Sequence, residues 1–244
     1  MLLAGVVFVS TGGWIHYNTR VLNEFITSEE RLDLQEAYEK QFKQYQGQPI
    51  LVATDVHAKV DIFPQEKRIH AVVTSTMRNK YDQPIEKMLV SLPSNTKDIQ
   101  IDMPGATLGE IDDKFNIAWL TFAQPIAPQQ VVQMVVTLNR QQQGFADTGQ
   151  DSSVVENGTF INNAELLPRF GYQSNFELSE RHERSKRGLP PPQRDNKLED
   201  SRFYQENFFG PESDFINYEA VVSTAADQIA ISPGYLQKEW QEIK

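Results

Sequence analysis

The stretch "LVATDVHAKVDIFP", residues 51–64, decides the fold class because its apolar and polar side chains alternate along the chain. The apolar set is Val52, Val56, Val60 and Ile62, and the polar set is Asp55, His57, Lys59 and Asp61. Successive side chains of a β-strand point to opposite faces, so this period of two predicts a half-buried strand.

Several later stretches repeat this character and are separated by turn sequences. The predicted strands are "RIHAVVTSTMRN" (68–79), "IEKMLVSLP" (85–93), "FNIAWLTF" (115–122), "QQVVQMVVTLNR" (129–140), "FINYEAVVST" (215–224) and "QIAISPGYL" (228–236). The turn signals between them include "NKYDQP", "SNTKD" (94–98), "DMPG", "IDDK" and "QPIAPQ". Short strands joined by polar turns without intervening long helices predict a mainly β fold, an antiparallel saddle-like β-sandwich.

A short basic helix and an N-terminal helical segment complete the predicted architecture. The helix lies in "ELSERHERSKRGLPPPQR" (177–194), before the Pro190–Pro192 run that ends it. Its basic residues are Arg181, Arg184, Lys186 and Arg187. We interpret them as a solvated helix face, with docking on anionic lipid or an acidic partner as the alternative.

The N-terminal residues are apolar from Leu2 to Val9 and carry no Lys or Arg before Arg20. A membrane-spanning helix needs about 20 apolar residues, and this run is shorter. We interpret residues 1–18 as the end of a transmembrane helix with interfacial aromatic residues, and residues 19–48 as a helical connector. A signal-like anchor and a buried soluble segment are the alternatives. Within the connector, Ser28 is the predicted cap of a second helix, which Gly47 and Pro49 end.

Composition excludes several classes of function. The 244 residues carry a formal charge of −10, whereas nucleic-acid binding needs clustered Lys and Arg. The chain has no cysteine, so disulfides, thiolate zinc sites and cysteine nucleophiles are excluded.

"HERSK" at 182–186 falls short of the zinc motif H-E-x-x-H because Lys186 replaces the second histidine. We expect His57 and His70 to face solvent on strands, and the chain contains no complete active site.

The passage "NGTFINNAELLPRFGY", residues 157–172, differs from the surrounding strands. It places two asparagines and a glutamate close together and continues into an aliphatic pair, a proline and an aromatic–glycine–aromatic triplet. One interpretation is a loop whose amides satisfy buried backbone groups near Pro168 and Gly171. The other is part of a binding site.

Three blocks of the chain resemble a known family. "VDIFPQEKRIHAVVTSTMRNKYDQPIEKMLVSLP" is similar to the opening strands of the gluzincin zinc metallopeptidases of the aminopeptidase N type. Residues 157–189 and 214–240 resemble a bacterial branch in which an aminopeptidase-like region is fused to an ABC-type transporter permease. In this family an N-terminal saddle-shaped β domain precedes a thermolysin-like catalytic domain. The resemblance covers essentially the whole chain, and its last two blocks are the distinctive ones.

The resemblance implies an organisation and a function. Residues 49–244 would be the noncatalytic N-terminal β domain of a membrane-bound aminopeptidase-like protein, with a catalytic domain after Lys244. Whether that protein is an active zinc aminopeptidase stays open, and the zinc would belong to it, with no cofactor in this chain. The alternative is an extracytoplasmic accessory domain of an ABC permease that binds peptide or partner without hydrolysis. The implied partners are the catalytic domain, the membrane, an ABC ATPase subunit and a peptide, at a periplasmic position on the cell inner membrane.

The resemblance also implies a substrate-binding site. The family's β domain carries a T-Q-x-E stretch that grips the free amine of the substrate, and its counterpart here is Thr159 to Asn162. The acid position holds Asn162, which lacks the charge that an ammonium prefers. The expected substrate-binding residues are therefore Asn162, Asn163 and Glu165. No catalytic or metal-ligating residue is expected in this chain.

Overall fold

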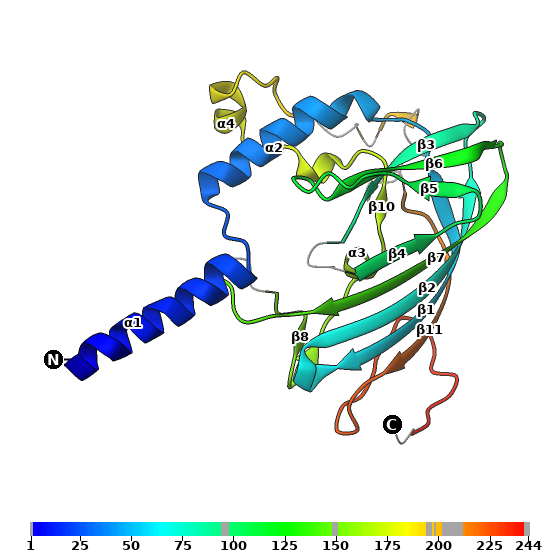
Figure 1. Cartoon of the computed structure of the whole chain (residues 1–244). Helices are drawn as coiled ribbons and strands as arrows, with labels where there is room; N and C mark the ends of the chain where they lie inside the picture. The colour runs from blue at the N-terminus through cyan, green and yellow to red at the C-terminus, as the bar shows by residue number, and fades with distance from the viewer. Residues whose placement is uncertain are drawn as a thin grey trace.

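The computed structural model describes residues 2–93, 98–147, 151–193, 197, 199–201 and 212–241. Within these residues the chain forms a β body with helices on one side (Figure 1). Most of the turn predicted over 94–98, and most of residues 197–214 before the predicted strand 215–224, lies outside the described residues.

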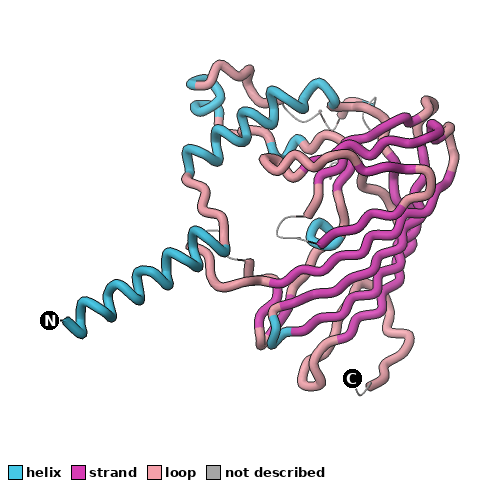
Figure 2. Tube along the Cα trace, in the orientation of Figure 1, coloured by secondary structure: helices cyan, strands magenta, loops and turns pink. Residues whose placement is uncertain are grey.

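The larger sheet has five strands in the order β11-β1-β2-β7-β4. Their bounds are Leu51–Phe63 for β1, Arg68–Asn79 for β2, Asp98–Asp102 for β4, Val131–Gln141 for β7 and Asn217–Ser223 for β11. All pairings are antiparallel except that of β1 with β11, which is parallel. Figure 2 shows these strands as a strongly curved sheet. The alternation in residues 51–64 therefore predicted a central strand of this sheet correctly.

A second sheet packs against the first. It has the order β10-β3-β6-β5, and a separate pair is formed by β8 and β9. The bounds are Ile85–Ser91 (β3), Ala106–Leu108 (β5), Ile117–Ile126 (β6), Val154–Val155 (β8), Gly158–Thr159 (β9) and Arg169–Phe170 (β10). Leu51, Met77 and Met134 of the first sheet share one core with Met88 and Leu120 of the second. The predicted mainly β sandwich is confirmed.

Four helices occur in the described residues, and the first two of them form an arm beside this body (Figure 1). The helices are α1 (Leu2–His16), α2 (Ser28–Phe42), α3 (Asn163–Leu166) and α4 (Arg181–Lys186), with a π-helical turn at Tyr17–Leu22 and 3-10 turns at Lys43–Tyr45, Pro64–Glu66 and Ser174–Phe176. No residue of α1 is buried. None of the helices in the described residues has both the length and the apolar character needed to cross a membrane. The assignment of residues 1–18 to the end of a transmembrane helix stays a prediction.

The cap of α2 lies one residue earlier than predicted. Thr27, not Ser28, is the N-cap: its hydroxyl accepts a hydrogen bond from the Glu30 backbone N–H, and the Glu30 carboxylate accepts one from the Thr27 backbone N–H. This capping box satisfies two backbone donors that the first helical turn leaves unpaired. Further along the helix, Tyr38 and Phe42 are buried against the β body.

Helix α4 is not the solvated basic helix that its sequence indicated. The Arg184 side chain is only 1% exposed, and its guanidinium donates to both carboxylate oxygens of Glu39 on α2 at 2.7 Å. The Arg187 side chain is also buried and pairs with the acidic residues Glu29, Asp33, Glu36 and Glu183. The prediction of a solvated face is wrong for these two arginines. Arg181 and Lys186 are exposed.

The last predicted strand is also wrong. Residues 228–236 form no strand, and Ile229, Ile231, Tyr235 and Leu236 are each at least 79% exposed. Extended segments are stabilised as strands by pairing with a neighbour. Within the described residues this segment pairs with no strand, so its apolar alternation alone does not produce one.

The ion pair of Glu39 predicts a loss of stability in acid. Burial alone would raise the pKa of Glu39, but the hydrogen bonds from Arg184 and Lys43 outweigh it and hold the pKa below its usual value. A carboxylate with a lowered folded-state pKa stabilises the fold above its unfolded pKa of about 4.3, and this contribution disappears as pH falls through the folded pKa. We expect urea unfolding to show a nearly constant free energy from about pH 7 to 5 and a decline below. The Glu39→Gln variant should show a shallower decline, and an unchanged slope would contradict this assignment.

Candidate functional site

The predicted substrate-binding residues lie at the short helix α3. Asn162 is its N-cap, with the side-chain oxygen accepting from the Ala164 N–H at 2.9 Å. The amide nitrogen of Asn162 donates to one carboxylate oxygen of Glu165 at 2.9 Å. Both ends of the Asn162 amide are therefore engaged within α3, although the residue is exposed.

Glu165 is held by an arginine that the sequence analysis did not identify. Its second oxygen accepts from Arg140 Nη1 at 3.0 Å, and Arg140 also pairs with Asp151. The Arg140 side chain is 9% exposed and continues the row of buried residues Met134, Val136 and Leu138 on β7. A buried guanidinium requires carboxylate partners, because an unpaired charge is costly away from water. An arginine at the end of an inward-facing apolar row was the signal that could have revealed this pair.

Asp151 completes this network. Burial would raise the pKa of its carboxyl, but hydrogen bonds from Ser153 and the Arg140 guanidinium lower it. One Asp151 oxygen accepts from the Ser153 backbone N–H at 3.0 Å and from its hydroxyl at 2.7 Å. One guanidinium thus pairs with two carboxylates, so the ion-pair network of Arg140, Asp151 and Glu165 carries a net negative charge.

Asn163 is the predicted site residue whose side chain remains available. It is exposed, and no hydrogen bond from the described residues engages its side-chain amide. It lies next to Asn162, so the cap geometry fixes its backbone. An exposed amide can both donate to and accept from a peptide backbone.

The loop around α3 is anchored by its apolar residues. Leu166 is buried against the larger sheet, and Phe170 belongs to the core shared by the two sheets. Gly171 adopts a φ of +77°, and a Cβ there would lie 3.0 Å from Ile50 Cγ2. The apolar side chains of this passage are therefore structural, and Asn163 is exposed. A role of the passage in a binding site stays a prediction.

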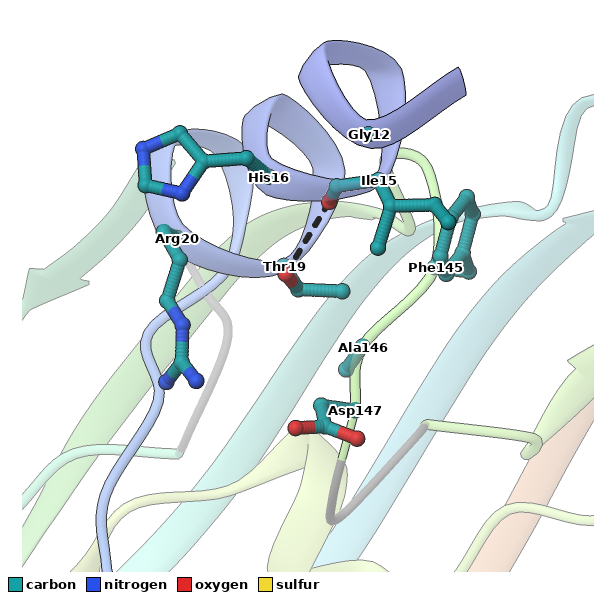
Figure 3. A pocket seen from close by; sticks show the side chains of 8 residues that line it. All are labelled: Gly12, Ile15, His16, Thr19, Arg20, Phe145, Ala146 and Asp147. Atoms are coloured by element: carbon teal, nitrogen blue, oxygen red, sulfur yellow. Dashed lines mark hydrogen bonds between the residues drawn. The ribbon is translucent and has the colours of Figure 1, made fainter. Parts of the chain in front are cut away.

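A concave surface lies where α1 meets the β body. It is a groove of about 520 Å³, and its described lining is Gly12, Ile15, His16, Thr19, Arg20, Phe145, Ala146 and Asp147 (Figure 3). Trp14 contacts Phe145 with ring centroids 5.0 Å apart. Asn23 donates to the backbone carbonyls of Gln143 and Phe145. The groove brings together segments about 125 positions apart, which the sequence analysis did not foresee, and no predicted site residue lines it.

The histidines and acidic residues do not form a metal centre in the described part of the chain. No group of three His, Cys, Asp or Glu side chains there could hold a metal ion. His57 on β1 is half exposed, with Nδ1 3.4 Å from a Glu219 oxygen, and His70 on β2 lies 2.8 Å from the Asn139 side-chain oxygen. The family resemblance implies zinc only in a following catalytic domain, so no chemical step is assigned to zinc in this chain.

Comparisons with known proteins give a limited result. No protein-family model matches the chain, and no curated protein matches it. Similar solved structures include an M1 zinc metallopeptidase from Deinococcus radiodurans, with 14% identity, a TM-score of 0.31, and coverage of 40% of this chain and 22% of that one. Another is a mutant two-domain M1 zinc metallopeptidase bound to L-tryptophan, with 13% identity, a TM-score of 0.34, and coverage of 56% and 32%.

The chain therefore spans between about a fifth and a third of these metallopeptidases. They belong to the aminopeptidase N-like group that the sequence resembles, at low coverage. A likeness with TM-scores this small carries no argument about function.

Proposed function

We propose that this chain is the noncatalytic β domain of a membrane-bound, aminopeptidase-like protein and that α3 helps to frame the site for the peptide N-terminus. The proposal rests on the sequence resemblance of residues 157–189 and 214–240. One structural observation supports the role of α3 in particular: Asn163 presents a free amide from a helix whose cap and base are fixed. Because the backbone that carries this amide is fixed, ligand binding would order only the side chain and cost less entropy than ordering a mobile loop.

The partners of Glu165 determine which groups of α3 could contact a peptide. Its carboxylate already accepts hydrogen bonds from Asn162 and Arg140, so its charge is largely compensated. Asn163 would contact the peptide by hydrogen bonding, while the catalytic groups and the zinc belong to the following domain of the proposed parent. The membrane contact, the permease and the periplasmic position are part of the same proposal.

The ion pair between Glu165 and Arg140 also favours a second function. Capture of an ammonium is strongest when a free carboxylate accepts from it. Since Glu165 is engaged by Arg140, α3 also suits an extracytoplasmic domain of an ABC permease that binds peptide or partner without hydrolysis. The two functions differ in turnover and in preference for a free amine.

The test is a comparison of Asn163→Ala with the native residue in the full-length protein. If Asn163 bonds to the charged amine, kcat/KM for free-amine peptides should fall by about 10- to 150-fold, which corresponds to roughly 1.5–3 kcal/mol. N-terminally acetylated peptides, which carry no ammonium, should be affected much less. The measurement is steady-state kinetics on matched free and acetylated peptides.

Asn157→Ala is the matched control, because Asn157 is an exposed asparagine of the same loop outside α3. It should leave both peptide classes unchanged. Equal losses for free and acetylated peptides on Asn163→Ala would contradict amine recognition by α3. Binding of both peptides without any turnover would favour the permease accessory function.

A further inference from the structure

Strand β11 forms an open edge of the five-stranded sheet. No strand lies beyond it in the described part of the chain (Figure 1). It has seven residues, whereas the other sheet edges are shorter: β4 has five, β5 three and β10 two. An edge strand presents unpaired backbone N–H and C=O groups, which are a template for pairing with another strand.

This edge is regular and lacks the features that usually protect an edge. The register with β1 runs without a break from Asp55↔Asn217 to Asp61↔Ser223. Asn217 donates to Asp55 at 2.7 Å and Ser223 to Asp61, so side chains fasten both ends of β11. Proteins protect edges with bulges, prolines and several charged residues. Glu219 is the single charged residue of β11, which has no proline and no bulge.

The sequence of β11 is complementary to itself in an antiparallel arrangement. Pairing about Ala220 would place Tyr218 opposite Val222, Glu219 opposite Val221 and Asn217 opposite Ser223. Residues opposite each other share a face, so apolar side chains meet on the core side and no like charges meet on the outer side. Phe215, which is 99% exposed, would continue the register opposite Ala225.

The opposite edge of the sheet lacks this property. If two copies of β4 paired antiparallel about Gln100, Asp98 of each copy would lie opposite Asp102 of the other. Like charges directly opposite each other destabilise a strand pair. Charge thus protects β4 against self-association and leaves β11 open to it.

We propose that β11 is an interaction surface for a second copy of this chain. Two β11 strands pair antiparallel about Ala220 and join the two five-stranded sheets into one continuous sheet. The contact is isologous, so it closes into a dimer and does not propagate into a fibre. This inference does not depend on the proposed peptide function.

Sedimentation velocity on a series of charge variants of β11 tests whether the chain dimerises through this strand. The full chain should dimerise reversibly as its concentration rises through about 5–200 µM, the range in which moderately weak contacts are populated. Val221→Glu places the new carboxylate of each copy opposite Glu219 of the other copy, so the symmetric contact contains two pairs of like charges. The change should weaken dimerisation by about 5- to 30-fold. Within one copy the new carboxylate lies beside Lys59, its register partner on β1, so the fold should be preserved.

The rescue variant makes the test specific. Glu219→Lys combined with Val221→Glu places opposite charges across the contact and should restore dimerisation, while Glu219→Lys alone should retain it. Gln100→Glu on β4 should have no effect. A chain that stays monomeric at the highest concentration, or a dimer that is insensitive to Val221→Glu, would overturn the proposal. Association through the exposed α1 would persist in Val221→Glu and vanish on removal of residues 2–13, and this result would also overturn it.

Discussion

Replacing Glu39 by alanine is expected to lower the free energy of unfolding by about 3–5 kcal/mol, because the change leaves the buried Arg184 guanidinium without its carboxylate. Arg184 is 1% exposed and Glu39 is 2% exposed, so water cannot replace the lost partner. The remaining hydrogen-bond acceptors of Arg184 are the uncharged carbonyls of Leu178 and Pro190, both at 2.6 Å. The Glu177 carboxylate lies 3.8 Å from Arg184 Nη1, beyond hydrogen-bond distance, so it replaces Glu39 only in part. Lys43 would also lose one of its two carboxylate partners.

Urea unfolding monitored by circular dichroism measures this effect, and Glu66→Ala is the control. Glu66 pairs with Arg68 at 2.8 Å on the surface, where such a pair contributes about 0–1 kcal/mol. Hydrogen exchange of the amides in α4 would show whether the loss is local to this helix or extends through the domain. If Glu39→Ala costs no more than Glu66→Ala, the ion pair does not hold α4 on α2.

Replacing Asn79 by alanine is expected to cost about 3 kcal/mol, because one buried and two partly buried backbone groups lose their partner. Asn79 is fully buried at the end of β2. Its amide donates to the carbonyls of Gln83 at 2.8 Å and Ile126 at 2.9 Å, and its side-chain oxygen accepts from the Tyr81 N–H at 3.0 Å. One side chain thus joins the turn after β2 to the end of β6, which belongs to the other sheet.

Asn139→Ala is the matched control on the neighbouring strand β7. Asn139 is exposed and contacts His70, so its removal should change stability by less than about 1 kcal/mol. Equilibrium denaturation of both variants, with unchanged m-values, gives the comparison. Similar costs for the two variants would show that the backbone groups near Asn79 find other partners.

The sequence predicted the strands of the sandwich well because strand periodicity is a local property. Residues 51–64 and 68–79 alternate on their own, and the structure places them in β1 and β2 with nearly the same bounds. The same local reasoning failed at residues 228–236, because an alternating segment forms a strand only when a neighbouring strand pairs with it.

The candidate site was only partly predictable. The family resemblance of residues 157–172 singled out Asn162, Asn163 and Glu165, and their role in substrate binding stays a prediction. The sequence could not show that Asn162 caps α3 and binds Glu165, because that depends on where the helix begins. It also could not pair Glu165 with Arg140, which lies on another strand 25 positions earlier.

The sequence by itself determined the mainly β class, the positions of the long strands and the polar character of the α3 loop, because each depends on neighbouring residues. Only the tertiary structure decided which charges are buried and which edges are open. Arg184 meets Glu39 across 145 positions, and β11 joins β1 in parallel although about 160 positions separate Asp55 from Asn217. The energy of a charge or of a strand edge depends on what surrounds it in space, and no local pattern in a sequence contains that information.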